Sequence, residues 1–211
     1  MSFIVFDCEG VLRPTKGLSK VVLEYLKKYF KIRIPEAEIA KNVSIFSGGT
    51  FHGAYFKALE FFVPGYDQEK AEQCYRELLK KRATIYKEVE AFPEVIDTLE
   101  KLSKSHYLAI STGLEKIYIE EWLKRTNIIH LFKEIYSGDD GTKEKHIQMI
   151  RQKYPEERIV YVGDAISEMK LGVPAIGVAR NSSQEQLLWI AGAKAVVSSL
   201  NEILDIDLDL L

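Results

Sequence analysis

The sequence predicts an α/β protein in which a Rossmann-like, doubly wound parallel sheet carries an inserted all-helical segment. In the second half of the chain, short apolar runs alternate with stretches of helical spacing, which is the pattern of parallel strands joined by helices. A long stretch of helical spacing alone, from about residue 16 to residue 89, interrupts this alternation after the first apolar run. The length of 211 residues suits one such domain with a sizeable insertion, or two small domains.

The predicted strands are short and continuously apolar, as expected of parallel strands buried on both faces. The first, residues 3–6, ends at Asp7, and Gly10 and Pro14 then break the local structure. Four more runs of this kind follow, at residues 107–110, 159–162, 175–178 and 195–197. Helical spacing separates them around residues 95–102, 117–123 and 147–150. Right-handed crossovers place the carboxyl ends of such strands at one edge of the sheet, where folds of this kind bind ligands.

The insertion has the spacing of amphipathic helices. Apolar residues recur at helical intervals between residues 18 and 29 and again between 75 and 86. Proline and glycine residues punctuate further helices, so we expect about four helices and no strand in this segment. The expected boundaries are 1–15 and 90–211 for the sheet domain and 16–89 for the helical domain. We expect the alternating Asp and Leu residues of 205–211 to form a terminal strand or a frayed tail.

The composition argues against several classes of partner. Lysine and arginine together number 29 and aspartate and glutamate 31, so no basic surplus indicates nucleic-acid binding. Cys8 and Cys74 are far apart, and the opening apolar run is too short for a secretory leader, which favours reduced thiols in a cytoplasmic protein. No apolar stretch reaches the length of a membrane span. The sequence gives no indication of the oligomeric state.

Polar residues follow the ends of several predicted strands. They are Asp7 and Glu9 after the first strand, Ser111 and Thr112 after the second, Asp164 and Glu168 after the third, and Lys143 at the start of a helix. Four carboxylates that meet at one sheet edge would repel one another and lose hydration. A hard cation resolves this conflict, and Mg²⁺ suits a site of carboxylates, water and phosphate oxygens. Such a cation also lets a carboxylate approach a phosphate that would otherwise repel it.

These segments resemble the four motifs of the haloacid-dehalogenase-like hydrolase superfamily, and the resemblance covers nearly the whole chain. Residues 6–12, Phe-Asp-Cys-Glu-Gly-Val-Leu, are similar to the first motif, Asp-x-Asp-Gly-Thr/Val-Leu, and residues 108–112 to the second, an apolar strand that ends in Ser or Thr. Lys143 fits the third motif, and residues 162–168 resemble the fourth, Gly-Asp-x-x-x-Asp/Glu. The insertion lies where phosphoglycolate-phosphatase-like members carry a helical cap.

The resemblance implies a Mg²⁺-dependent phosphatase that hydrolyses a small phosphorylated metabolite. Asp7 would be the nucleophile that forms an aspartyl-phosphate. Asp7 and Asp164 would bind Mg²⁺ together with the backbone carbonyl of Glu9, and Glu168 would bind it directly or through water. Phosphate oxygens would be held by Ser111, Thr112 and Lys143, and the cap loop at Gly48 and Gly49 would contact the substrate.

Each of these roles has a plainer alternative. Ser111 could be the cap of the next helix, Lys145 could replace Lys143, and Glu168 could lie on an exposed helix face. The Gly48–Gly49 pair could form an ordinary turn between helices.

Glu9 departs from the family pattern, which has Asp at this position as the acid and base. Glutamate can do the same proton chemistry, but its extra methylene moves the carboxyl group by on the order of 1.5 Å. We expect Glu9 to remain the acid and base. Three alternatives stay open: a 2-haloacid dehalogenase, which in this superfamily needs no metal; a phosphomutase; and a non-catalytic binding or regulatory protein of the same fold.

Overall fold

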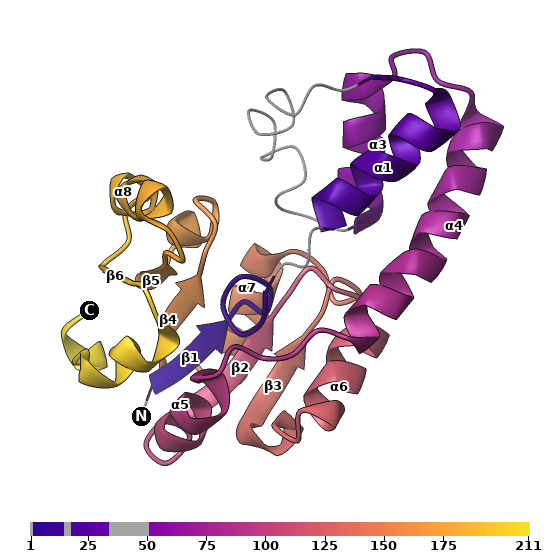
Figure 1. Cartoon of the computed structure of the whole chain (residues 1–211). Coiled ribbons are helices and arrows are strands. Elements are labelled where there is room, and N and C mark those ends of the chain that lie inside the picture. The colour runs from indigo at the N-terminus through magenta and orange to yellow at the C-terminus, as the bar shows by residue number, and fades with distance from the viewer. Residues whose placement is uncertain (1, 15–17, 34–50) are drawn as a thin grey trace. The chain divides into compact units, whose positions relative to one another are not determined.

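The computed structural model describes residues 2–14, 18–33 and 51–211 (Figure 1). The chain forms two compact units, one of residues 1–14 and 90–211 and the other of residues 15–89. The first unit contains a sheet and the second, in its described part, only helices. Within the described ranges, no helix is both long enough and apolar enough to cross a bilayer.

The sheet has six parallel strands in the order β3-β2-β1-β4-β5-β6. The strands are β1 (Ser2–Phe6), β2 (Tyr107–Ser111), β3 (Phe132–Tyr136), β4 (Arg158–Gly163), β5 (Ala175–Val178) and β6 (Ala195–Val197). The chain first builds outward from β1 to β3 and then crosses to the other side of β1 to form β4. This reversal creates a switch point between β1 and β4, the place where ligands bind in open parallel sheets. The predicted fold class is confirmed.

Strand β3 is the one strand that the apolar runs did not predict. It lies at the edge of the sheet and contains Lys133 and Glu134, so it is not a continuous apolar run. An edge strand has one side open to solvent and can carry charged side chains, whereas the central strand β1 is buried at all five positions.

Helices flank the sheet (Figure 1). They are α5 (Val95–Leu102), α6 (Lys116–Arg125), α7 (Lys143–Lys153) and α8 (Ser182–Ala191), with short 3₁₀ turns η2 (Ile129–Leu131), η3 (Glu168–Lys170), η4 (Leu200–Asp205) and η5 (Leu208–Leu210). Phe3 and Val5 of β1 share one core cluster with Ile147 and Ile150 of α7 and Leu188 of α8. Alternate residues of β1, Ile4 and Phe6, are also fully buried, so both faces of this strand are covered.

The prediction of a terminal strand or frayed tail for residues 205–211 is wrong. The segment from residue 200 onward forms two 3₁₀ turns, η4 and η5, and Leu208 is buried. A capping box between Ser199 and Glu202 starts the first turn. The alternation of Asp and Leu suggested a strand, but backbone hydrogen bonds from the N–H of Ile206 to the carbonyl of Ile203 and from the N–H of Leu210 to that of Asp207 close turns here.

The helical unit contains α1 (Leu18–Phe30), α3 (Phe51–Phe62) and α4 (Gln68–Lys87), which include both segments of predicted helical spacing. Their apolar faces form one cluster, whose members are Val22, Leu26, Phe51, Tyr55, Ala58, Leu59, Ala71, Cys74 and Leu78. Asp67 caps the amino end of α4 by accepting a hydrogen bond from the backbone N–H of Lys70. The predicted substrate loop at Gly48 and Gly49 lies outside the described residues.

Candidate active site at the carboxyl edge of the sheet

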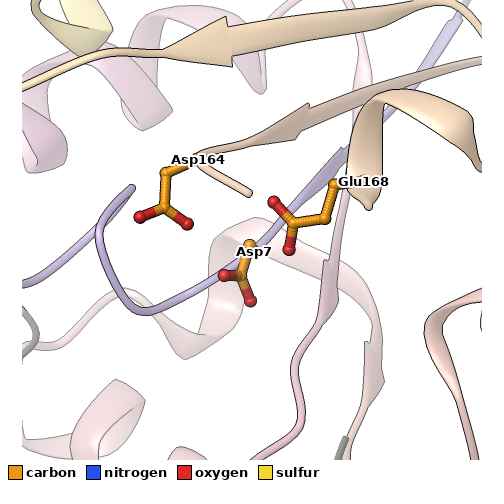
Figure 2. A group of neighbouring side chains, drawn as sticks. All are labelled: Asp7, Asp164 and Glu168. Atoms are coloured by element: carbon orange, nitrogen blue, oxygen red, sulfur yellow. The ribbon is translucent and has the colours of Figure 1, made fainter. Parts of the chain in front are cut away.

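Asp7 and Asp164 lie on the two sides of the switch point. Asp7 directly follows β1, and its backbone N–H donates to the carbonyl of Val162 in β4 at 2.9 Å. Asp164 directly follows β4, and Glu168 begins the turn η3. Figure 2 shows the three side chains pointing toward one another, and each has a carboxylate oxygen within 4.8 Å of the others. The sheet topology therefore gathers three of the predicted carboxylates at one point.

Two glycines provide the space for these carboxylates. Gly10 has a φ of +81°, and a Cβ at this position would overlap the carboxylate of Asp164. A Cβ on Gly163 would overlap the carboxylate of Glu168. Because glycine has no Cβ, the backbone at these two positions can lie directly against the carboxylates.

Lys143 is the positive charge among these carboxylates. It is the first residue of α7, and its Nζ lies 2.9 Å from Oδ1 of Asp7 and also contacts Oε1 of Glu168. Burial acts to lower the pKa of Lys143, but the carboxylate of Asp7 and its other neighbours raise that pKa well above its ordinary value. The alternative, Lys145, is exposed. Lys143 is therefore the lysine that is both charged and close to Asp7.

The carboxylates carry more negative charge than Lys143 can balance. Burial, then the charges of Asp7 and Glu168, raise the pKa of Asp164 to about 8. Burial is also the main reason that the pKa of Glu168 is raised, although Lys143 opposes this shift. Three buried or largely buried carboxylates around one ammonium group leave an excess of hard oxygen ligands. This donor set fits Mg²⁺, with Asp7, Asp164 and Glu168 as the residues that would hold it.

Replacement of Asp164 by asparagine is expected to stabilise the metal-free protein at pH 8. The pKa of Asp164 is raised from its ordinary 3.8 to about 8, so this residue destabilises the fold as pH rises from about 4 through 8. The wild-type Tm without metal should fall over that range. The Tm of the variant should fall less over this range. At pH 8 the variant should be more stable than the wild type by about 1–2 kcal/mol, or roughly 2–8 °C in Tm. Mg²⁺ should raise the Tm of the wild type much more than that of the variant.

Differential scanning calorimetry in EDTA, at pH 5 and pH 8, measures this difference. Asp97→Asn on α5 is the matched control, because Asp97 is an exposed carboxylate that pairs only with Lys101 in the described contacts. An Asp164→Asn variant that is no more stable than the wild type at pH 8 would show that the carboxylates do not repel one another in the metal-free protein.

Ser111 is the last residue of β2 and is completely buried. Its Oγ lies 2.9 Å from Nδ1 of His146 in α7, and its backbone carbonyl accepts a hydrogen bond from the hydroxyl group of Tyr161. The hydroxyl oxygen of Thr112 accepts the backbone N–H of Leu114 at 3.2 Å, so Thr112 shapes the loop after β2. His146 had no metal-ligand spacing in the sequence and was missed. Its position three residues after Lys143, on the same helix face, is the signal that could have found it.

Glu9 is not a member of the group of three carboxylates whose oxygens lie within 4.8 Å of one another. It is half-buried in a tight loop in which the N–H of Leu12 donates to the carbonyl of Cys8 at 2.9 Å and the N–H of Gly10 to that of Arg13 at 2.8 Å. The carboxylates that would hold a cation are therefore those of Asp7, Asp164 and Glu168, without the side chain of Glu9. Cys8 is fully buried, and burial raises the pKa of its thiol to about 12, which rules out a thiolate nucleophile at neutral pH.

Arg180 fixes the loop after β1, a role that no pattern in the sequence indicated. Its Nη2 donates to the carbonyl of Val11 at 3.0 Å, and its Nη1 binds Oε1 of Glu94 at 2.6 Å. The guanidinium group also lies over the ring of Phe92, 3.8 Å from its centre. A fixed loop matters here because it carries both Asp7 and Glu9.

Known proteins share this fold along the whole chain. The pyrophosphatase PpaX of Oceanobacillus iheyensis is 26% identical over 216 residues, which cover 96% of this chain and 95% of that protein. The structure of a predicted phosphoglycolate phosphatase from Haemophilus somnus aligns with a TM-score of 0.80 and 18% identity over 97% of both chains. A haloacid dehalogenase-like protein of Streptococcus pneumoniae, SP0104, aligns with a TM-score of 0.74 and 23% identity over 97% of both chains.

The family comparison covers strands β1 to β5, the helical unit and all four motifs. Residues 4–178 match the model of the haloacid dehalogenase-like hydrolases. This range starts inside β1 and ends with β5, so it includes every strand end that carries a candidate site residue. The resemblance that the four motifs predicted, and with it an enzyme of the hydrolase class, is confirmed. The chain belongs to the haloacid dehalogenase-like hydrolase family.

Proposed function

We propose that this protein is a Mg²⁺-dependent phosphatase that hydrolyses a small phosphomonoester through an aspartyl-phosphate on Asp7. The observation that carries the proposal is the position of Asp7 at the switch point, beside two further carboxylates and 2.9 Å from the ammonium group of Lys143. A nucleophilic carboxylate needs positive charge close by if it is to approach an anionic phosphate. The names of the relatives, a pyrophosphatase and a phosphoglycolate phosphatase, support the same class of reaction.

The reaction follows from the roles of the chain's own residues. An oxygen of Asp7 attacks phosphorus, a new carboxylate–phosphorus bond forms, and the ester bond from phosphorus to the leaving oxygen breaks. Glu9 in its protonated form gives its proton to that leaving oxygen. The resulting Glu9 carboxylate then takes a proton from a water molecule that attacks the phosphorylated Asp7, which releases phosphate and restores both residues. Bound Mg²⁺ would supply charge neutralisation at the phosphate.

Three further residues would position the phosphate group of the substrate. Lys143 contacts Asp7 directly and can share its charge with phosphate oxygens. Ser111 and Thr112 lie at the end of β2, the neighbour of β1 in the sheet, and each carries a hydroxyl group. We assign the helical unit, including the loop with Gly48 and Gly49, the role of a cap that selects the leaving group.

Metal removal is expected to abolish turnover of p-nitrophenyl phosphate. With EDTA, kcat/KM should fall at least about 10²-fold, because charge neutralisation by a bound metal is worth several kcal/mol. Added Mg²⁺ should restore the activity in steady-state assays. A panel of phosphorylated metabolites and pyrophosphate, assayed in parallel by phosphate release, identifies the substrate class.

The alternatives give different results in the same assays. A 2-haloacid dehalogenase would release chloride from 2-chloropropionate with or without EDTA and would not release phosphate. A phosphomutase would interconvert sugar phosphates with little phosphate release. A non-catalytic member would bind metal, seen as a higher Tm in Mg²⁺, but turn over no compound of the panel.

A further inference from the structure

His146 forms a fully buried pair with Ser111 that the proposed reaction does not yet use. Both residues have no exposed surface, and Nδ1 of the imidazole lies 2.9 Å from Oγ of Ser111. The pair joins the end of β2 to the first turns of α7, across 35 residues of sequence. On its flat face the imidazole stacks against Tyr136, with the ring centres 5.5 Å apart and the planes at 22°. The ring of His146 is thus held in one position behind the predicted phosphate-binding hydroxyl group.

The surroundings keep this imidazole neutral. Burial lowers the pKa of His146, while a hydrogen bond between the ring and the Ser137 backbone and the charge of Asp140 act in the opposite direction. The ammonium groups of Lys143 and Lys145 add to the lowering. A neutral imidazole carries one proton, on either Nδ1 or Nε2, and the two choices have different consequences for Ser111.

The hydrogen bonds favour the proton on Nδ1. Nε2 is buried and has no partner of normal hydrogen-bond geometry among the described residues, so a proton there would be a poorly satisfied donor. The Ser137 backbone, whose hydrogen bond to the ring raises the pKa of His146, is the acceptor that competes with Ser111 for the ring proton. A proton on Nδ1 is donated to Oγ of Ser111. The hydroxyl proton of Ser111 is then turned away from the ring. With the opposite tautomer, Ser111 would donate its proton to Nδ1 and present only lone pairs to an anion, which would repel it.

We propose that His146 is a positioning residue that donates from Nδ1 to Ser111 and thereby directs the Ser111 hydroxyl proton toward a phosphate oxygen of the substrate. This inference rests on the proposed function, because it assumes that Ser111 binds phosphate. Loss or misdirection of a hydrogen bond to a charged group lowers affinity and rate by about 10- to 100-fold.

The test combines four variants. His146→Leu keeps a buried side chain of similar size but removes the hydrogen bond, and His146→Asn retains an N–H group close to the position of Nδ1. Ser111→Ala and the double variant Ser111→Ala/His146→Leu complete a double-mutant cycle. For each variant we would measure kcat/KM on p-nitrophenyl phosphate with Mg²⁺, the affinity for inorganic phosphate by calorimetry, and Tm.

The expected result is coupling between the two residues. His146→Leu should lower kcat/KM and phosphate affinity about 10- to 100-fold, and His146→Asn should restore most of this loss. In the Ser111→Ala background the His146→Leu substitution should change either quantity less than about twofold. A ¹⁵N NMR spectrum of the wild type should show His146 neutral and protonated on Nδ1, and this measurement does not depend on how the variants fold.

Several results would overturn the proposal. Equal losses from His146→Leu in both backgrounds, or no rescue by asparagine, would mean that the ring only fills space. A proton on Nε2 in the NMR spectrum would contradict the tautomer. A wild type that binds inorganic phosphate and shows the coupling but turns over no ester would refute the proposed function alone. A wild type that hydrolyses p-nitrophenyl phosphate without the coupling would refute the role of His146 alone, and one that neither hydrolyses an ester nor binds phosphate would refute both.

Discussion

Replacement of Asp7 by asparagine is expected to lower kcat for p-nitrophenyl phosphate by at least about 10⁴-fold. The amide group has no negative charge with which to attack phosphorus, so the aspartyl-phosphate cannot form. Asp7 is only 6% exposed, and its carboxylate lies 2.9 Å from Nζ of Lys143 and within 4.8 Å of those of Asp164 and Glu168. Steady-state kinetics with saturating Mg²⁺ measure the loss.

Two further measurements show whether the loss of kcat comes from removal of the nucleophile. Asp97→Asn, an exposed substitution of the same chemistry on α5, should leave kcat unchanged. Beryllofluoride, which binds an ionised carboxylate as a phosphate mimic, should raise the Tm of the wild type in Mg²⁺ and leave that of Asp7→Asn unaffected. A variant that kept more than about a tenth of the wild-type kcat would exclude Asp7 as the nucleophile, since loss of a nucleophile costs far more than that.

Replacement of Glu9 by glutamine is expected to lower kcat by about 10²–10⁴-fold with little change in KM. Glutamine has nearly the same shape but can neither donate a proton to the leaving oxygen nor accept one from water. The loss should be larger for an alkyl phosphate than for p-nitrophenyl phosphate, because p-nitrophenolate leaves readily without a proton. Assays of both esters with wild type and variant therefore separate the acid role of Glu9 from its role as a base.

Glu9→Asp is the matched variant, because it keeps the carboxyl group and shortens the side chain by one methylene. It should retain more activity than Glu9→Gln, with a change of no more than about 10²-fold from the wild type, the cost of a displacement of about 1 Å. The loop itself should not shift, since Arg180 binds its carbonyl group at Val11. Unchanged turnover in Glu9→Gln would assign the proton transfers to another group.

The sequence by itself determined the sheet and most of the strand ends. Strand β1 is buried at all five positions and β4 at every position after Arg158, and strands buried on both faces are largely apolar, so they are visible as continuous runs. The polar residues that follow them, Asp7 and Asp164, are then placed at one edge by the rules of parallel connections. The edge strand β3 escaped this reasoning because its solvent-facing positions carry charge.

For the candidate site, the sequence indicated which residues follow the strand ends but not all of their contacts. Spacing and motif order indicated the acidic residues and favoured Lys143 at the start of α7, but they left Lys145 open as an alternative. The structure places Lys143 against two carboxylates and leaves Lys145 exposed. This difference depends on where α7 begins relative to the sheet, which is set by packing rather than by local pattern.

Only the tertiary structure revealed the partners of His146 and Arg180. His146 meets Ser111 across 35 residues, and Arg180 meets Val11 across 169. Hydrophobic periodicity records which face of an element is buried, because burial affects every turn of a helix or strand in the same way. A single polar contact between distant segments leaves no such repeated pattern, because it depends on the three-dimensional packing that brings two particular side chains together.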